Sequence, residues 1–316
     1  MANILFIGIE YFAYTQRIVE EMRSQGHRVS FHVMEPVDFW SKAAKRYLPS
    51  KFEKQLDRHH RAIVEAERTN SYDIVLFLQV HRMAPEIVAT LRQDHHGARF
   101  VLYNWDSLNT HNYVPWLTYF DRALTFDADD SINNGMDYLP LFALPEYFAA
   151  RHDQPKRFDL YFVGATATPA RVRAIAALRR FAEATGLRFG THLQCSLSSM
   201  ITLARRGLWL RGMTPRSIGH REIIALMEQS RGVFDFANHR QAGYTMRFIE
   251  NLCAGMKIVT ANARIYGEPF YSPERFLVID GDLNFDRIPE FLATELADQP
   301  DFEQFSLASW VRRLLG

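Results

Sequence analysis

Short apolar segments alternate with helical patterns along the first part of the chain. The segment Ile4–Gly8 is apolar throughout and ends in glycine, and residues 16–22 then carry apolar side chains at helical spacing. Gly26 ends that helical pattern, and the segment 28–33 again favours a strand. Strand, helix and strand in this order are typical of the opening of a parallel α/β unit.

The alternation continues to residue 142 and begins again after a looser stretch at 143–155. In the first half, further strands are predicted at 74–80, 99–103, 123–126 and 138–142, and helices at 51–70 and 85–92. In the second half, strands are predicted at 160–164, 232–236 and 257–260, and helices at 169–185, 222–228, 245–254 and 307–315. The pattern of residues 186–215 predicts no element.

This pattern predicts an α/β protein with two Rossmann-like domains facing a cleft. We place the domains at 1–145 and 146–316, because Pro145, Pro155 and the charged segment 151–153 interrupt the alternation between them. The amphipathic C-terminal helix of this half is able to pack back on the first domain.

Composition and charge exclude several classes of protein but do not indicate a specific function. The chain has 316 residues and a formal net charge of +1, so it has no basic field for wrapping nucleic acid, and we expect no nucleic-acid partner. The two cysteines, Cys195 and Cys253, form neither a metal-binding spacing nor a disulfide framework. The chain shows no secretion signal and no apolar run of about 18 residues. We therefore expect a cytoplasmic protein.

The segment 234–255 carries the most informative chemistry. A buried strand leads through a polar loop with Gly243 into a helix near Thr245, and a helix N-terminus offers free N–H groups to a phosphate. Arg247 lies in the first turn, where the helix dipole disfavours a cation unless an anion binds there. Glu250 follows, and a carboxylate accepts hydrogen bonds from both hydroxyls of a ribose. The alternative is an exposed Arg247–Glu250 surface pair, with Thr245 as a simple helix cap.

The spacing Q-x-G-x-T-M-R-x-x-E-x-x-x-A-G-x-K-x-x-T over 241–260 resembles bacterial capsular and lipopolysaccharide biosynthesis proteins with the GT-B glycosyltransferase fold. Other pieces resemble the same family in the same order: Tyr103–Ser107, Phe120–Asp121, Thr125–Asp127, Leu139–Phe142 and Tyr161–Gly164. The resemblance implies that the N-terminal domain binds an acceptor and that the C-terminal domain binds a nucleotide-sugar donor.

The resemblance also implies roles for individual residues. Glu250 should hold the ribose, and Gly243, Thr245, Met246 and Arg247 should hold the diphosphate. The full set of expected donor-binding residues is Gly164, Arg171, His239, Gln241, Gly243, Tyr244, Thr245, Met246, Arg247 and Glu250. Retaining enzymes of this fold typically carry a second glutamate before the glycine-bearing loop, but Ala242 occupies that position here. The stereochemical outcome therefore stays open.

An inverting transfer needs a general base to accept the proton of the acceptor hydroxyl. Asp106 directly follows a predicted strand, at the sheet edge where α/β proteins bind ligands, and is the first candidate. His111 and Glu10 are the other catalytic candidates, although each is also explained as an ordinary loop residue, and Asp106 as a turn or cap. Trp105 and Tyr11 offer rings on which an acceptor sugar can stack.

Asp127 and Asp129 form a D-x-D pair that is able to hold a divalent metal, but helix capping explains them as well, and we expect no metal. Arginines at 171, 173, 179, 180, 205 and 206 are able to face an anionic membrane or lipid diphosphate, although such runs are usually solvated helix faces. Arg171 is the exception, since it lies at a second helix N-terminus that is able to face the donor phosphates.

These observations favour a metal-independent glycosyltransferase that uses a nucleotide-sugar donor and no cofactor. The expected acceptor is a surface polysaccharide or a lipid-linked glycan, with peripheral contact to the inner face of the cytoplasmic membrane. A nucleotide-sugar epimerase or hydrolase of the same fold is one alternative. A non-catalytic protein that binds nucleotide sugars or polysaccharide is the other.

Overall fold

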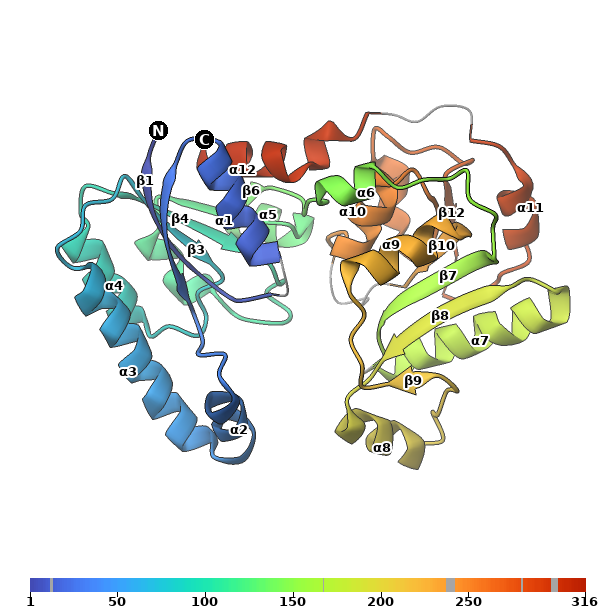
Figure 1. Ribbon diagram of the computed structural model, residues 1–316, viewed down its shortest axis with the longest axis horizontal. Coiled ribbons are helices and arrows are strands. Elements are labelled where there is room, and N and C mark those ends of the chain that lie inside the picture. The colour runs from blue at the N-terminus through green and yellow to red at the C-terminus, as the bar shows by residue number, and fades with distance from the viewer. Residues whose placement is uncertain (12–13, 167, 237–241, 280, 297–300) are drawn as a thin grey trace. The chain divides into compact units, whose positions relative to one another are not determined.

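A computed structural model describes the chain except for residues 12–13, 167, 237–241, 280 and 297–300. The chain divides into two compact units, and each has its own parallel sheet with helices packed around it (Figure 1). The first unit comprises 1–141 and 307–316, and the second comprises 142–306. The predicted α/β class with two Rossmann-like units is confirmed.

The first unit is built on a parallel sheet with strand order β2-β1-β3-β4-β5-β6. Its strands are β1 (Asn3–Gly8), β2 (Arg28–Val33), β3 (Ile74–Leu78), β4 (Arg99–Asn104), β5 (Arg122–Thr125) and β6 (Asp137–Tyr138). Its helices are α1 (Tyr14–Ser24), α2 (Phe39–Tyr47), α3 (Pro49–Glu67), α4 (Pro85–Asp94), the 3₁₀ helix η1 (Val114–Tyr119), α5 (Ala128–Asn134) and α12 (Leu307–Leu315). The apolar runs of β1, β3 and β4 are buried, as strands covered on both faces must be.

The C-terminal helix α12 belongs to the first unit. Trp310 is buried, with its ring 4.9 Å from that of Tyr103 on β4. Arg99 and Arg122 donate from the sheet to carbonyl oxygens at the end of the helix, Arg122 at 2.9 Å to Arg313. These carbonyls have no partner within a helix, so the two arginines complete its C-terminus.

The second unit repeats the plan, with parallel strand order β12-β11-β10-β7-β8-β9. Its strands are β7 (Phe158–Ala165), β8 (Phe189–Gln194), β9 (Met213–Thr214), β10 (Ser230–Asp235), β11 (Lys257–Thr260) and β12 (Phe276–Val278). Its helices are α6 (Pro145–Phe148), α7 (Pro169–Thr185), α8 (Leu197–Arg205), α9 (His220–Glu228), α10 (Met246–Cys253), η2 (Ala263–Gly267), α11 (Ile288–Ala293) and η3 (Glu303–Phe305). The unassigned region 186–215 therefore supplies one βαβ unit at a sheet edge.

The boundary between the units falls at 141/142, a few residues before the position that the loosened pattern suggests. The residues that follow Leu141 are bound to the second unit. Ala143 forms a β-bridge with Ser306, and the buried Tyr147 bonds through its hydroxyl to His220 Nδ1 at 3.0 Å. In the described part of the chain, no helix has the length and apolar character needed to cross a bilayer.

Candidate functional site

The motif of the second unit converges on the carboxyl edge of its sheet. Thr245 caps α10, accepting from the Phe248 N–H at 3.1 Å, and its hydroxyl donates to Asp235 at 3.3 Å. Thr260 donates to the other carboxylate oxygen of Asp235 at 3.1 Å. Asp235 ends β10 and Thr260 ends β11, and burial raises the pKa of Asp235. These hydrogen bonds fix the start of α10 at the edge where α/β sheets bind ligands.

Arg247 and Glu250 form a largely buried pair. Arg247 Nη1 lies 2.5 Å from Glu250 Oε2 and 3.4 Å from the hydroxyl of Tyr147. Glu250 is fully buried, whereas the Arg247 side chain is 23% exposed. The idea of an exposed surface pair is therefore wrong. Arg247, rather than Glu250, is the member of the pair that reaches the surface.

Asn251 anchors this pair to the sheet. It donates to the Arg247 carbonyl at 2.7 Å and accepts from the Tyr161 hydroxyl at 2.6 Å. Asn251 and Tyr161 are both buried, and burial raises the pKa of the Tyr161 phenol well above its usual range. Tyr161 comes from β7, so the first turn of α10 has a fixed position relative to the centre of the sheet.

Arg171 lies at the same edge, in the first turn of α7. It donates through Nε to the Phe236 carbonyl at 3.0 Å and through Nη1 to the Ala165 carbonyl at 2.8 Å. These carbonyls follow β10 and end β7, so Arg171 bridges two strand ends. Burial lowers the pKa of its guanidinium, and the charge of Asp235 acts against that effect. The side chain places a cation beside the α10 N-terminus.

The remaining expected donor residues differ in placement. Tyr244 is buried, with its ring stacked 4.4 Å from Phe248 and its hydroxyl donating to Glu268 at 2.9 Å, so its side chain packs the loop. Gly164 lies within β7, Gly243 is buried just before α10, and Met246 begins that helix. His239 and Gln241 lie outside the described residues.

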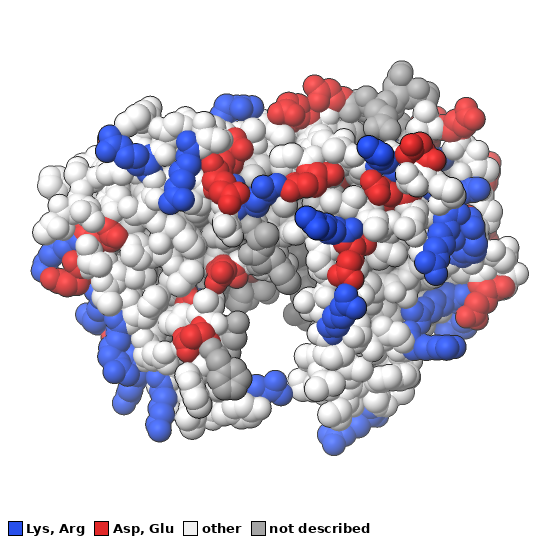
Figure 2. All heavy atoms as spheres, in the orientation of Figure 1, with Lys and Arg blue, Asp and Glu red and all other residues white. Residues whose placement is uncertain are grey.

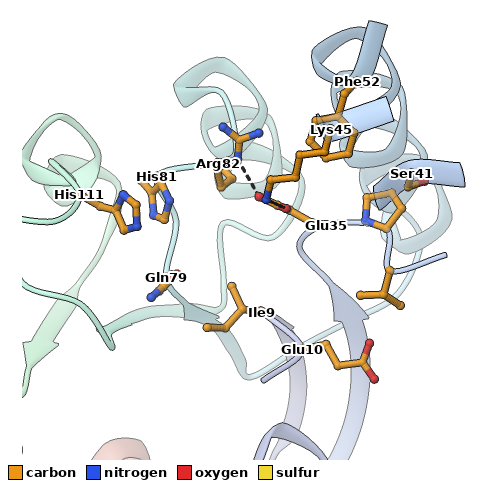
Figure 3. A pocket seen from close by; sticks show the side chains of 12 residues that line it. Ile9, Glu10, Glu35, Ser41, Lys45, Phe52, Gln79, His81, Arg82 and His111 are labelled. Atoms are coloured by element: carbon orange, nitrogen blue, oxygen red, sulfur yellow. Dashed lines mark hydrogen bonds and ion pairs between the residues drawn. The ribbon is translucent and has the colours of Figure 1, made fainter. Parts of the chain in front are cut away.

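A pocket of about 540 Å³ lies in the first unit (Figure 3). Its wall includes two of the catalytic candidates, Glu10 and His111. Asp106 accepts from Gln79 Nε2 at 2.7 Å and lies 3.8 Å from His111 Nε2. Both Asp106 and His111 remain partly exposed. The structure thus brings Asp106 and His111 together, while Glu10 lines the pocket from the loop after β1.

Gln79 holds Asp106 from a strained position. Gln79 directly follows β3 and is buried. Its backbone φ of 64° lies in the left-handed region, which is rare for residues other than glycine. Its own N–H donates to the Tyr103 carbonyl at 2.9 Å. Strain of this kind persists where the surrounding structure enforces it, often at functional sites.

His81 extends the group around His111. The two imidazole rings stack with centroids 3.8 Å apart and an interplanar angle of 10°. Burial, with the charges of His111 and Arg82, lowers the pKa of His81 to about 4. His81 is therefore neutral near pH 7, and a neutral ring is able to stack closely on His111 whether or not His111 is protonated.

Opposite the histidines, Glu35 pairs with two cations. It bonds to Lys45 and, at 2.8 Å, to Arg82 Nε (Figure 3). Burial alone raises the pKa of Glu35, but the hydrogen bonds and charges of Lys45 and Arg82 outweigh it and hold the pKa low. One side of the pocket is therefore an ionised cluster.

The segment that contains the D-x-D pair forms hydrogen bonds that hold the backbone near this site. Asp127 caps α5, accepting from the N–H groups of Asp129 and Asp130 at 3.0 and 3.3 Å. Asp130 then accepts from the Leu108 N–H at 2.7 Å, which fixes the loop between Asp106 and His111. Among the residues that the structure describes, no three His, Cys, Asp or Glu side chains are grouped to hold a metal ion.

The aromatic candidates differ from expectation. The Trp105 ring packs against the rings of Tyr11 and Tyr14, with centroids 5.8 and 6.2 Å away, and Trp105 is only 8% exposed. Trp105 is therefore used in packing against Tyr14 of α1 and against Tyr11, which precedes that helix. Tyr11 is 42% exposed, although its ring also packs against Tyr14 and Trp105.

The basic runs also separate into distinct roles. Arg179 donates to Thr191 Oγ1 at 2.6 Å and to the Arg211 carbonyl at 2.7 Å, which ties α7 to the edge of the second sheet. Arg205 and Arg206 are exposed at the end of α8. Sequence reasoning missed Gln79, His81, Asp130 and Tyr147. Their partners lie far away in the chain, and only the positions of Gln79 and His81 within three residues of the end of a buried strand offered a signal.

Comparison with known proteins supports the fold. No family model and no curated protein matches this sequence. An alpha-glucosyltransferase in complex with UDP and a mismatched 13-mer DNA is similar, with a TM-score of 0.61 at 11% identity, covering 100% of this chain and 95% of that one. The apo form of the lipopolysaccharide outer core galactosyltransferase WaaB gives 0.55 at 16% identity, covering 99% of each chain.

An enzyme of another class shares the architecture. The UDP-GlcNAc 2-epimerase from Neisseria meningitidis, bound to UDP-GlcNAc, gives a TM-score of 0.57 at 8% identity, covering 99% of this chain and 98% of that one. At these identities the similarity shows the fold alone. The chain therefore has the GT-B fold, and its activity has to be argued from its own residues.

Proposed function

We propose that this protein is a GT-B glycosyltransferase that moves a sugar from a nucleotide-diphosphate donor to a surface polysaccharide or lipid-linked glycan. The observation that carries the proposal is the edge of the second sheet, where a capped helix N-terminus, Arg171 and Arg247 lie on neighbouring strand ends. Free N–H groups and two guanidinium groups are suited to a diphosphate, which leaves with negative charge when the glycosidic bond forms.

On this proposal the donor reaction is metal-independent and uses no cofactor. A divalent ion would stabilise the departing diphosphate by its charge, and Arg247, Arg171 and the helix dipole supply positive charge instead. The ribose is expected beside the first turn of α10. Because Arg247 covers the Glu250 carboxylate, ribose binding by Glu250 requires the Arg247 side chain to turn toward the phosphates.

For an inverting transfer, we assign the general base to Asp106 in the first unit. Its carboxylate accepts the acceptor hydroxyl proton while the hydroxyl oxygen bonds to the sugar C1 and the bond from C1 to the diphosphate oxygen breaks. Gln79 holds one carboxylate oxygen of Asp106, and the adjacent His111 stabilises negative charge there when protonated. Tyr11 and the pocket that includes Glu10 are the expected acceptor contacts, and the expected location is the inner face of the cytoplasmic membrane.

A nucleotide-sugar epimerase is the second candidate, because an epimerase shares this fold. Incubation with a nucleotide sugar and no acceptor distinguishes the two. An epimerase changes the sugar, whereas a transferase leaves it intact apart from slow hydrolysis. A non-catalytic nucleotide-sugar or polysaccharide binding protein would bind the nucleotide without turnover.

The first experiment is a thermal-shift screen of the whole chain against UDP, GDP, CDP, TDP and CMP, with and without EDTA. A ligand that binds only the folded state raises the Tm by mass action, by an amount that grows with its concentration over Kd. We expect one nucleoside diphosphate to raise the Tm equally with and without EDTA, and Arg247→Ala to abolish the shift. A shift that requires a divalent ion would contradict metal independence, and no shift from any nucleotide would contradict the donor assignment.

A further inference from the structure

A short helix beside the first unit's pocket presents large apolar side chains to solvent. On α2, Trp40 and Tyr47 are 78% and 72% exposed. They are seven residues apart, which places them on the same side of the helix. Val37 and Leu48, which flank the helix, are also exposed. Single exposed apolar side chains are ordinary, but four large ones between residues 37 and 48 form a patch.

Basic residues surround this patch. The segment 40–54 contains five basic residues and one acidic residue, although the whole chain has a net charge of only +1. Arg46, Lys51 and Lys54 are exposed, and the Arg46 guanidinium lies 5.5 Å from the centre of the Tyr47 ring. Figure 2 shows Lys and Arg side chains gathered at the lower left of the molecule, the region of α2 and α3 in Figure 1.

We propose that these residues (Val37, Trp40, Tyr47 and Leu48 with Arg46, Lys51 and Lys54), named here the α2 surface, dock on an anionic lipid bilayer. Trp and Tyr favour the boundary between lipid headgroups and hydrocarbon, and basic side chains are attracted to anionic headgroups. A protein partner fits less well, because the buried centres of protein interfaces are depleted in lysine.

The same helix also forms part of the pocket wall. Ser41 and Lys45 of α2 line the pocket, together with Phe52 of α3. A docked α2 surface therefore brings the pocket next to the headgroup layer. If the glycosyltransferase proposal holds, on which this step rests, the acceptor class is a lipid-linked glycan whose sugar reaches the pocket while its lipid remains in the bilayer.

Co-sedimentation of the full chain with vesicles tests the surface directly. One set of vesicles contains phosphatidylcholine alone, and the other contains phosphatidylcholine mixed with phosphatidylglycerol. We expect binding to the mixed vesicles that weakens with salt. Trp40→Ser with Tyr47→Ser should lower the affinity on the order of tenfold. Lys51→Gln and Lys54→Gln should each lower it roughly fivefold.

Matched variants distinguish binding through the α2 surface from non-specific attraction of the whole protein to vesicles. Trp209→Ser removes an exposed tryptophan of the second unit, and Arg61→Gln with Arg68→Gln removes two charges, one in the last part of α3 and one directly after it. These variants should bind vesicles as the unmodified chain does. A loss of affinity in the Arg61→Gln, Arg68→Gln variant as large as that in the lysine variants would overturn the assignment to the α2 surface. Absence of vesicle binding would overturn docking on lipid and leave the surface to a protein partner.

The Tm without ligand serves as the folding control and should be unchanged in every variant. The nucleotide thermal shift reports on the second unit, and it separates the two proposals. If the protein binds mixed vesicles through the α2 surface but binds no nucleotide, the result supports the docking surface and overturns the proposed function. If the protein binds nucleotide but no vesicles, the result overturns the docking surface alone.

Discussion

The two units hold their charged groups in different ways. At the edge of the second sheet, Glu250 and Asp235 are buried and bonded to neighbouring side chains. In the first unit, His111 lines the pocket and lies 3.8 Å from Asp106, and both side chains are partly exposed. The first arrangement fixes the start of a helix, whereas the second leaves polar groups accessible to solvent. Variants in the two places should therefore fail differently.

The largest expected effect is on turnover at Asp106. Asp106→Asn keeps the size of the side chain but removes the proton acceptor, so transfer should fall by about 10²–10⁴-fold. Nucleotide binding should not change, because that site lies in the other unit. Transfer is measured by product formation at saturating donor. Asp129→Asn, on the exposed part of α5, is the matched control, and undiminished turnover in Asp106→Asn would remove the residue as base.

Glu250 should affect both stability and binding. Glu250→Ala leaves Arg247 without its carboxylate partner and opens space in the core, so the free energy of unfolding should fall by about 3 kcal/mol. Nucleotide affinity should fall sharply as well, because the variant lacks the carboxylate that we expect to hold the ribose. Urea denaturation and nucleotide titration measure the two effects.

Two further variants sharpen this result. Glu250→Gln retains the shape of the side chain, so it should regain much of the stability while its nucleotide affinity stays low. Glu183→Ala, at an exposed position on α7, should change neither quantity. Unfolding of Glu250→Ala at the same urea concentration as the unmodified chain would show that the buried pair does not stabilise the unit.

The smallest expected effect concerns pH and His81. Its folded pKa of about 4 lies below the ordinary value of 6.5, so the unfolded chain takes up a proton first as the pH falls. The contribution to stability is complete above pH 6.5 and is lost between pH 6.5 and 4. His81→Phe keeps a stacked ring but does not titrate. Between pH 6.5 and 4 its Tm should therefore fall less than that of the unmodified chain, with the two Tm values diverging by roughly 3–5 °C.

The matched control for that comparison is His96→Gln, at an exposed position just after α4. Its Tm should follow that of the unmodified protein at every pH. Parallel Tm curves for the unmodified chain and His81→Phe would contradict the low pKa of His81.

Much of the fold follows from local pattern. The strands at 4–8, 74–80 and 99–103 were predictable because continuous apolar runs that end at glycine or polar residues are typical of parallel sheets. The helix start at Thr245 follows from a hydroxyl residue before an amphipathic segment. By contrast, β8 and α8 escaped prediction because Phe189–Gln194 alternates polar and apolar residues only weakly, in a strand next to the edge strand β9.

The sites were predictable only in part. The residue types and their places after strands made Asp106, Thr245 and Arg247 candidates, and their functional roles stay predictions. The sequence did not reveal that Glu250 is buried under Arg247, that Trp105 is covered by α1, or that His81 stacks on His111. Each of these facts depends on contacts between residues that are distant in the chain or on the packing of a neighbouring helix.

The return of α12 to the first unit has a consequence for the order of folding during synthesis. Residues 142–306 are contiguous and hold a complete sheet, so this unit is able to fold as it emerges. The first unit lacks α12, with Trp310 and the helix end bound by Arg99 and Arg122, until the whole second unit has been synthesised. The first unit is therefore synthesised first but completes its folding last.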